Sequence, residues 1–319
     1  TYSWPYIFYI NIPIGIIATL LTLRYVKSPK YGEKLSANQV DWYGILTLAG
    51  FIGSLQYVLE HGQQDDWFND KTIVTLSLIS FFSLFFFVWR QLTYKYPIVN
   101  LKVLKDTNLR VGTILSFIMG FGLYGSTFII PIYTQSILGW TATDAGLLLI
   151  PSSLMTAFMM PIIGQLLQKG VPQKYLVAIG FLMFFFFTFW MYNVMTPDTG
   201  EEYMYWPLII RGLGLGLLFV PITTLSLSTL KGKSIGEGAA FTGMMRQLGG
   251  SFGIAIITTF IARFSQEHRV NLIANIDATK TQVQDRITQL QHGFMAKGFS
   301  SNEALDKAHK IIDFSVNKQ

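Results

Sequence analysis

Long apolar runs alternate with short polar links along most of the chain. Eight runs of 18 to 25 residues hold only two charged side chains between them. An α-helix rises about 1.5 Å per residue, so roughly 20 residues cross a hydrocarbon core about 30 Å thick. Because backbone polar groups in lipid need partners within their own segment, these runs should be helices. The pattern predicts an all-α polytopic membrane protein with eight transmembrane helices at Trp4–Leu23, Trp42–Leu59, Thr72–Trp89, Val111–Tyr133, Ala145–Leu167, Tyr175–Val194, Trp206–Leu230 and Gly238–Ile261.

Lys and Arg collect on alternate links. The links after the first, third, fifth and seventh spans hold thirteen of them, whereas the opposite short links hold Lys71 alone beside eight Asp and Glu. The positive-inside rule places the basic links in the cytoplasm. The net charge of +6 therefore indicates membrane orientation, not a nucleic-acid partner. By the parity of the spans, residues 263–319 are expected to be extracytoplasmic.

Composition narrows the classes of function. Charged residues make up 13% of the chain, against about 25% in soluble proteins. The absence of cysteine excludes disulfides and thiolate metal sites. No predicted span holds a histidine or a central Asp or Glu, so an intramembrane metalloenzyme or protease is not supported. No P-loop pattern occurs, which argues against an ATP-driven motor.

The two charged residues inside the spans are Arg211 and Arg246. An arginine at the centre of a span costs about 2.5–3.5 kcal/mol on insertion scales, so each needs a polar partner or water. Arg211 lies five residues beyond Trp206 and is expected to reach the outer surface. Arg246 lies about 10 Å along its helix from Ala239. It shares one helix face with small residues, namely Ala239, Gly243, Gly250 and Gly253.

Two roles remain open for these arginines. Each could serve substrate or coupling electrostatics on a water-filled path, or could brace neighbouring helices as a buried strut. Aromatic and methionine side chains could add a soft pocket for apolar ligands, although packing is the alternative for each. These side chains are Phe117, Phe121, Tyr124, Met155, Met159, Met160, Met244 and Met245.

Other in-span residues indicate helix contacts. Small residues spaced four apart, Gly212 with Gly216 and Gly249 with Gly253, favour close packing of helices. The in-span amides are expected to hydrogen-bond between helices; they are Asn11, Gln56, Gln135, Gln165, Asn193 and Gln247.

The carboxyl-terminal segment, 263–319, is polar. Its apolar residues recur at roughly helical spacing, and Ser301 with Glu303 suggests a helix start. We expect a solvated helical loop, with a docking surface for a partner as the alternative. The sequence starts at Thr1 beside an apolar run, so we expect it to be part of a longer chain.

Six short motifs in order resemble one family. They are W-P-Y-I-F-Y-I-N-I-P-I-G at 4–15, D-W-Y-G at 41–44, P-I-V-N-L-K-V-L-K at 97–105, L-G-W-T-A-T-D-A-G-L-L-L-I-P at 138–151, R-G-L-G-L-G at 211–216 and R-Q-L-G-G-S-F-G at 246–253. Together they are similar to the 14-span drug:proton antiporters of the major facilitator superfamily, the EmrB/QacA type. The resemblance extends to about Ile261.

The resemblance implies a domain arrangement. Residues 1–26 would be the last helix of the amino-terminal half, and 27–110 a central linker with two extra transmembrane helices. Residues 111–262 would be five helices of the carboxyl-terminal half, and 263–319 an extracytoplasmic helical loop. The acidic coupling residues of the family lie mainly in earlier helices.

The resemblance also implies a function, namely proton-coupled efflux of hydrophobic or cationic drugs across a bacterial cytoplasmic membrane by alternating access. Such a protein is not an enzyme and uses the proton gradient without a cofactor. Implied partners are the bilayer, small-molecule substrates, and a periplasmic adaptor with an outer-membrane channel. The alternatives are a narrow-substrate transporter for a metabolite or siderophore, and a non-transporting membrane scaffold or lipid-modifying enzyme.

The candidate residues follow from both lines of reasoning. Substrate or coupling residues would be Arg246, Arg211, Gln247, Gln135, Tyr124, Phe117, Phe121, Met155, Met159 and Met244. Helix-packing residues would be Gly212, Gly216, Gly243, Gly249, Gly250 and Gly253.

Overall fold

The computed structural model describes residues 9, 11–26, 40–275, 281–296 and 298–318. Throughout these residues the regular structure is helical, and no strand occurs among them. Two compact units divide the chain, Thr1–Asp41 and Trp42–Gln319. The first contains α2, Asn11–Tyr25, an apolar helix of 15 residues. The start of the first predicted span lies outside the described residues.

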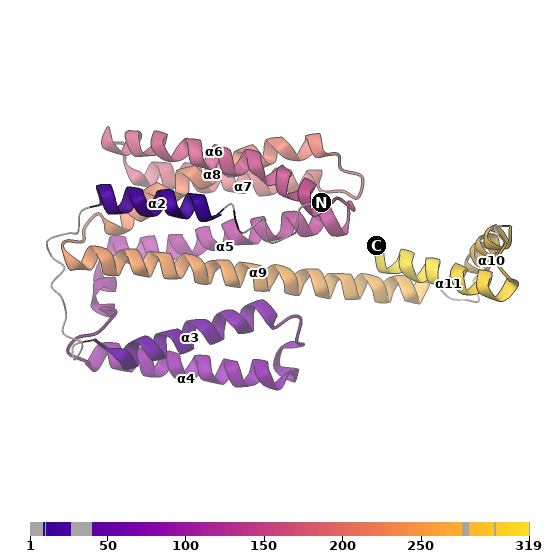
Figure 1. The fold of residues 1–319 in the computed structure, drawn as a ribbon, viewed down its shortest axis with the longest axis horizontal. Helices are drawn as coiled ribbons and strands as arrows, with labels where there is room; N and C mark the ends of the chain where they lie inside the picture. Colours follow the sequence, from indigo (N-terminus) through magenta and orange to yellow (C-terminus); the bar gives the residue numbers. More distant parts are fainter. Residues whose placement is uncertain (1–8, 10, 27–39, 276–280, 297, 319) are drawn as a thin grey trace. The chain divides into compact units, whose positions relative to one another are not determined.

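The second unit holds seven helices that are long and apolar enough to cross a membrane. This confirms the all-α polytopic fold and the remaining seven predicted spans. Figure 1 shows these helices with two further ones near the carboxyl terminus. Their bounds are α3 Trp42–His61, α4 Lys71–Thr93, α5 Thr107–Ser136, α6 Ala142–Gln168, α7 Gln173–Val194, α8 Glu201–Leu227, α9 Lys233–Asn275, α10 Thr281–Met295 and α11 Ser301–Lys318.

Polar side chains in the links set the start of several helices. The carboxylate of Asp106 accepts the backbone N–H of Leu109 at 2.9 Å and thereby caps α5. This bond and one from the Thr229 side chain hold the pKa of Asp106 below its usual value. Asp70 caps α4 in the same way. Because the caps lie in the polar links, α4 and α5 begin slightly before the apolar runs.

Helix α8 packs against both α6 and α7, while α5 packs mainly against α9. Buried Met204 and Leu208 of α8 meet Leu148 of α6 and Phe187 of α7 in one apolar cluster. A second cluster joins α8 to Met119 of α5. The bundle α5–α9 therefore has its core around α8.

The directions of the helices agree with the order of crossings. Helices α5 and α9, which are separated by an even number of crossings, run parallel. Residues on successive turns meet in the same order along both helices: Phe117 with Gly249, Phe121 with Gly253, and Gly125 with Ile257.

Helix α9 is longer than its apolar run predicts. The sequence indicates an end near Ile261, but the helix continues to Asn275 and has 43 residues. No glycine or proline follows Gly253 before Asn275, so nothing in this stretch breaks the helix. At about 1.5 Å per residue α9 is roughly 65 Å long, twice the hydrocarbon thickness. It extends past the ends of its neighbours in the bundle (Figure 1).

Helices α10 and α11 pack against each other and are amphipathic. A capping box starts α11: the Ser300 N–H and hydroxyl both donate to the Glu303 carboxylate, at 3.1 and 2.8 Å. The predicted helix start at Ser301 is therefore confirmed, and the residue that caps it is Ser300. These bonds lower the pKa of Glu303.

Candidate functional site

Arg211 is enclosed by α5, α6 and α8, with 4% of its surface exposed. Its Nε donates to Ser126 Oγ at 2.9 Å, and its Nη1 donates to Ser152 Oγ at 3.1 Å. Its Nη2 donates to the Thr127 hydroxyl and, at 3.4 Å, to the Leu123 carbonyl. One guanidinium therefore ties α8 to α5 and α6 through neutral acceptors.

The expectation that Arg211 reaches the outer surface is wrong. The guanidinium turns from α8 into the contact with α5 and α6, where its acceptors lie, and not along α8 toward the surface. The hydroxyl groups of α5 and α6 supply the polar surroundings that its burial requires.

Glycines next to Arg211 bring α8 close to α6. A β-carbon on Gly212 would lie 3.0 Å from the Met155 Cβ, and one on Gly216 would lie 2.5 Å from the Met159 Cβ. The Thr156 hydroxyl donates to the Gly212 carbonyl at 3.0 Å. Met155 and Met159 thus lie in the α6–α8 contact, apart from the aromatic residues of α5.

Arg246 is half-buried on α9. Its guanidinium carbon lies 4.8 Å from the centre of the Phe219 ring on α8, a cation–π arrangement. Its backbone carbonyl packs against Gly120 of α5. Among the described residues it makes no ion pair or hydrogen bond through its side chain, so its N–H donors remain available to a ligand or to water.

Tyr124 and Gln247 bridge α5 and α9 next to Arg246. The Tyr124 hydroxyl donates to Gln247 Oε1 at 3.2 Å. Two turns earlier on α5, the Phe117 ring lies 5.7 Å from that of Phe252. The structure therefore brings Arg246, Gln247, Tyr124 and Phe117 together along one helix contact.

Several in-span amides do not bridge helices. Gln135 is exposed and its side chain donates to the Pro131 carbonyl of its own helix at 3.2 Å. Asn193 donates to Phe189, and Gln56 to Glu60, also within one helix. The expected interhelical bonds are wrong for these three residues. A polar side chain with no polar group opposite bonds to its own backbone or a neighbour one turn away.

An apolar groove lies between α5 and α7, and Phe121, Gly122 and Phe184 line it throughout. Its larger part has a volume of about 380 Å³ and also reaches Ser126, which accepts a hydrogen bond from Arg211. Of the predicted pocket residues, Phe121 lines this groove. Met244 lies half-buried on α9, away from it.

The sequence pattern missed two sets of residues. The α7 wall of the groove, at Phe184, Phe187 and Met191, belongs to a phenylalanine-rich run that resembles a lipid-facing surface. The hydroxyl acceptors of Arg211 are Ser126, Thr127 and Ser152. They belong to two adjacent hydroxyl pairs in the sequence, Ser126–Thr127 and Ser152–Ser153. Two adjacent hydroxyl residues inside a span can indicate acceptors for a buried charge. The signal is weak, because a serine or threonine in a helix commonly bonds to its own backbone.

The α5–α9 contact depends on small residues. A β-carbon at Gly249 would collide with the Phe117 carbonyl oxygen, and one at Gly253 would lie 2.7 Å from the Phe121 carbonyl oxygen. Gly250 lies against the Tyr124 ring. Gly243 differs, because a β-carbon there would meet no atom within 4 Å. Gly243 therefore belongs to no close helix contact.

This contrast gives a matched pair of variants. Gly249→Ala should destabilise the protein by about 1–3 kcal/mol, because the methyl group overpacks the α5–α9 contact. Gly243→Ala should leave stability unchanged or raise it by up to about 1 kcal/mol, because alanine favours the helix. Thermal unfolding of both proteins in detergent measures the difference. Equal unfolding temperatures would contradict the close contact at Gly249.

The described residues hold no group of three His, Cys, Asp or Glu side chains that could bind a metal ion. The polar groups at the helix contacts described above are two arginines, several hydroxyls and the Tyr124–Gln247 hydrogen bond.

Known proteins are similar to this chain over its whole length. The fatty acid resistance protein FarB of Neisseria gonorrhoeae is 31% identical over 320 residues, covering 100% of this chain and 60% of FarB. The multidrug export protein EmrB of Escherichia coli is 29% identical over 324 residues, covering 99% of this chain and 63% of EmrB. The chain thus spans about three-fifths of the length of these relatives.

The Major Facilitator Superfamily model matches residues 1–254. The match includes α3 to α8 and the first part of α9, with both arginines. The apolar helices and this match make the chain a multi-pass protein of the cytoplasmic membrane. It belongs to the Major Facilitator Superfamily of transporters.

Proposed function

We propose that this chain supplies part of a proton-coupled exporter of hydrophobic or cationic drugs, of the EmrB type. The observation that carries the proposal is the similarity, over 99–100% of the chain, to one protein named for multidrug export and another named for fatty acid resistance. Fatty acids carry long apolar chains, and the α5–α7 groove offers an apolar surface for such a substrate.

In this proposal the domains follow the family order. Residues 1–26 end the amino-terminal half, 27–110 form a linker with two extra helices, and 111–262 form five helices of the second half. Residues 263–319 form an extracytoplasmic loop. Alternating access then moves the α5–α9 bundle against the other half of the transporter.

Arg246 is the proposed functional charge. It is half-buried, rests on Phe219 and has no ionic partner among the described residues. Tyr124 and Gln247 beside it add a hydroxyl and an amide at the same contact. A protonatable or anionic group on another part of the transporter would complete the pair. Arg211, whose donors are engaged by hydroxyls and a carbonyl, has the bracing role.

The energy source in this proposal is the proton gradient, without a cofactor and without enzymatic chemistry. The α10–α11 segment is a candidate contact for a periplasmic adaptor that leads to an outer-membrane channel. No specific observation on these helices favours a narrow-substrate transporter or a scaffold over the exporter.

The open reading frame that encodes this chain provides the test. Expressed in a drug-sensitive bacterial strain, it should raise resistance to several unrelated apolar or cationic drugs and should speed ethidium efflux. A protonophore should abolish that efflux, because the gradient drives it. Efflux that persists with the protonophore would exclude proton coupling, and unchanged sensitivity to every drug would exclude multidrug export.

A further inference from the structure

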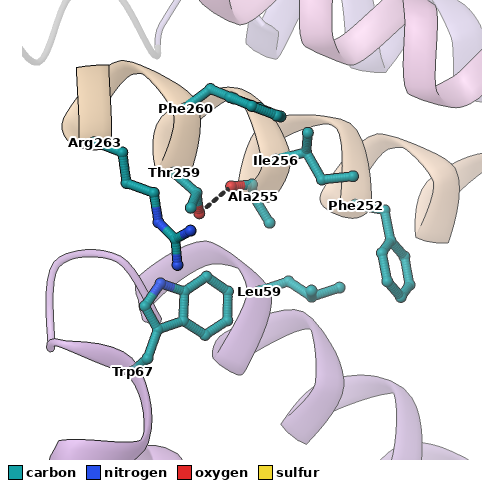
Figure 2. Close-up of a pocket in the computed structure, with 8 residues that line it drawn as sticks. All are labelled: Leu59, Trp67, Phe252, Ala255, Ile256, Thr259, Phe260 and Arg263. Atoms are coloured by element: carbon teal, nitrogen blue, oxygen red, sulfur yellow. Dashed lines mark hydrogen bonds between the residues drawn. The ribbon is translucent and has the colours of Figure 1, made fainter. Parts of the chain in front are cut away.

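A second apolar groove, of about 370 Å³, lies between α9 and the outer end of α3. Figure 2 shows its two walls: one face of α9 from Phe252 to Arg263, and Leu59 with Trp67 opposite. Trp67 belongs to a single 3-10 turn, Trp67–Asn69, which follows α3. This groove shares no lining residue with the α5–α7 groove.

The groove is apolar along its length and charged at one end. The Thr259 hydroxyl donates to the Ala255 carbonyl at 2.7 Å, so it offers little polarity to a ligand. Arg263 is the one charged residue among the described residues that line it. Its side chain reaches from α9 toward Trp67 (Figure 2). Among the described residues its guanidinium has no ionic or hydrogen-bonding partner.

Trp67 is held firmly in the opposite wall. Its indole N–H donates to Gln63 Oε1 at 3.0 Å, and its ring packs on Gly62 so closely that a β-carbon there would lie 2.7 Å away. Its backbone has a φ of 52°, and Asp66 before it has 55°. A non-glycine residue in this region is held there by its surroundings. The indole therefore forms a fixed edge to the groove.

The length of the groove matches one membrane leaflet. Eleven residues separate Phe252 from Arg263 on α9, about 16 Å of helix, and half of the hydrocarbon core is about 15 Å. By the order of crossings Arg263 lies at the outer interface. Tryptophan prefers that interface, and an arginine there can reach phosphate groups.

We infer that this groove binds a phospholipid of the outer leaflet. One acyl chain lies along α9 toward Phe252, and the phosphate accepts hydrogen bonds from Arg263, whose planar fork suits a phosphate. Charge complementarity selects this occupant, because an apolar slot that ends in one guanidinium with no partner among the described residues matches an acyl chain that ends in a phosphate. The bound lipid would complete the contact between α3 and α9. The inference does not depend on drug transport.

Native mass spectrometry of the purified full-length protein tests it, with phosphatidylglycerol and diacylglycerol of identical acyl chains as probes. The wild type should retain phosphatidylglycerol at least ten times more tightly than diacylglycerol. Arg263→Ala should lose at least tenfold in that affinity, the effect of one charge-assisted hydrogen bond. Thr259→Phe places a ring in the groove and keeps Arg263. This variant should also lose affinity for phosphatidylglycerol, because the ring occupies the space of the acyl chain.

Arg286→Ala is the matched control, because it removes the same charge from α10 outside the spans. It should retain the lipid like the wild type. Equal retention of phosphatidylglycerol by the wild type and all three variants would overturn the phosphate site. A wild type that binds diacylglycerol as tightly as phosphatidylglycerol would overturn it as well. A wild type that binds neither probe would overturn the lipid site altogether.

Discussion

Replacing Arg211 with alanine is expected to lower the free energy of unfolding by about 2–5 kcal/mol. The variant removes every bond from the guanidinium to Ser126, Ser152, Thr127 and Leu123, and leaves a hole between three helices. Hydrogen bonds between membrane helices contribute about 0.6 kcal/mol each on average, and the lost packing adds to them. Thermal unfolding in detergent, followed by size-exclusion chromatography, measures the effect.

Two further variants sharpen this result. Arg211→Lys should recover only part of the stability, because an ammonium cannot present the fork that joins α5 and α6 at once. Arg110→Ala, at an exposed position near the start of α5, should melt like the wild type. An Arg211→Ala protein that melts like the wild type but fails to transport would contradict the bracing role and move Arg211 into the transport path.

Replacing Arg246 with alanine should have the opposite signature. We expect drug efflux to fall at least tenfold while the unfolding temperature changes little, since the side chain makes one cation–π contact and no hydrogen bond among the described residues. Ethidium efflux rates and unfolding temperatures, measured on the same preparations of the full-length protein, separate the two effects.

Arg246→Lys distinguishes charge from geometry. It keeps a cation over Phe219 and should preserve part of the efflux if the charge alone matters. Lys231→Ala, at an exposed inner link, serves as the control and should transport normally. Wild-type efflux by Arg246→Ala, or a large loss of stability without a separate loss of transport, would make Arg246 a strut.

The sequence predicted the architecture well because it depends on simple physics. Long uncharged runs in lipid have to be helices, and alternate basic links fix their direction. The parallel pairing of α5 with α9 agrees with that direction. The glycines at 249 and 253 could also be anticipated, because only a small residue allows a carbonyl of the facing helix to approach so closely.

The relative burial of the two arginines could not be predicted from apolar runs. The sequence favoured Arg246 as the buried charge and Arg211 as the exposed one, whereas the structure buries Arg211 and leaves Arg246 half-exposed. The missing fact was the position of the acceptors of Arg211, which come from helices distant in sequence.

Helix ends and partners were the other weak points. A rule based on hydrophobicity ends α9 at Ile261, but a helix ends where a breaker or a cap occurs, and no glycine or proline occurs between Gly253 and Asn275. Similarly, Met155 and Met159 of α6 pack against α8 and do not line the apolar groove. Which side chains meet depends on how the helices cross, and residue type alone does not show it.

Drug-dependent proton movement tests the central claim most directly. The full-length protein is reconstituted in liposomes that hold a pH-sensitive dye, an inward-directed or outward-directed pH gradient is imposed, and ethidium transport is recorded with the internal pH. The account predicts that ethidium moves only against a proton flux, that its addition dissipates the gradient, and that Arg246→Ala abolishes both signals. Ethidium transport with no change in internal pH, or the same proton flux in Arg246→Ala, would contradict it.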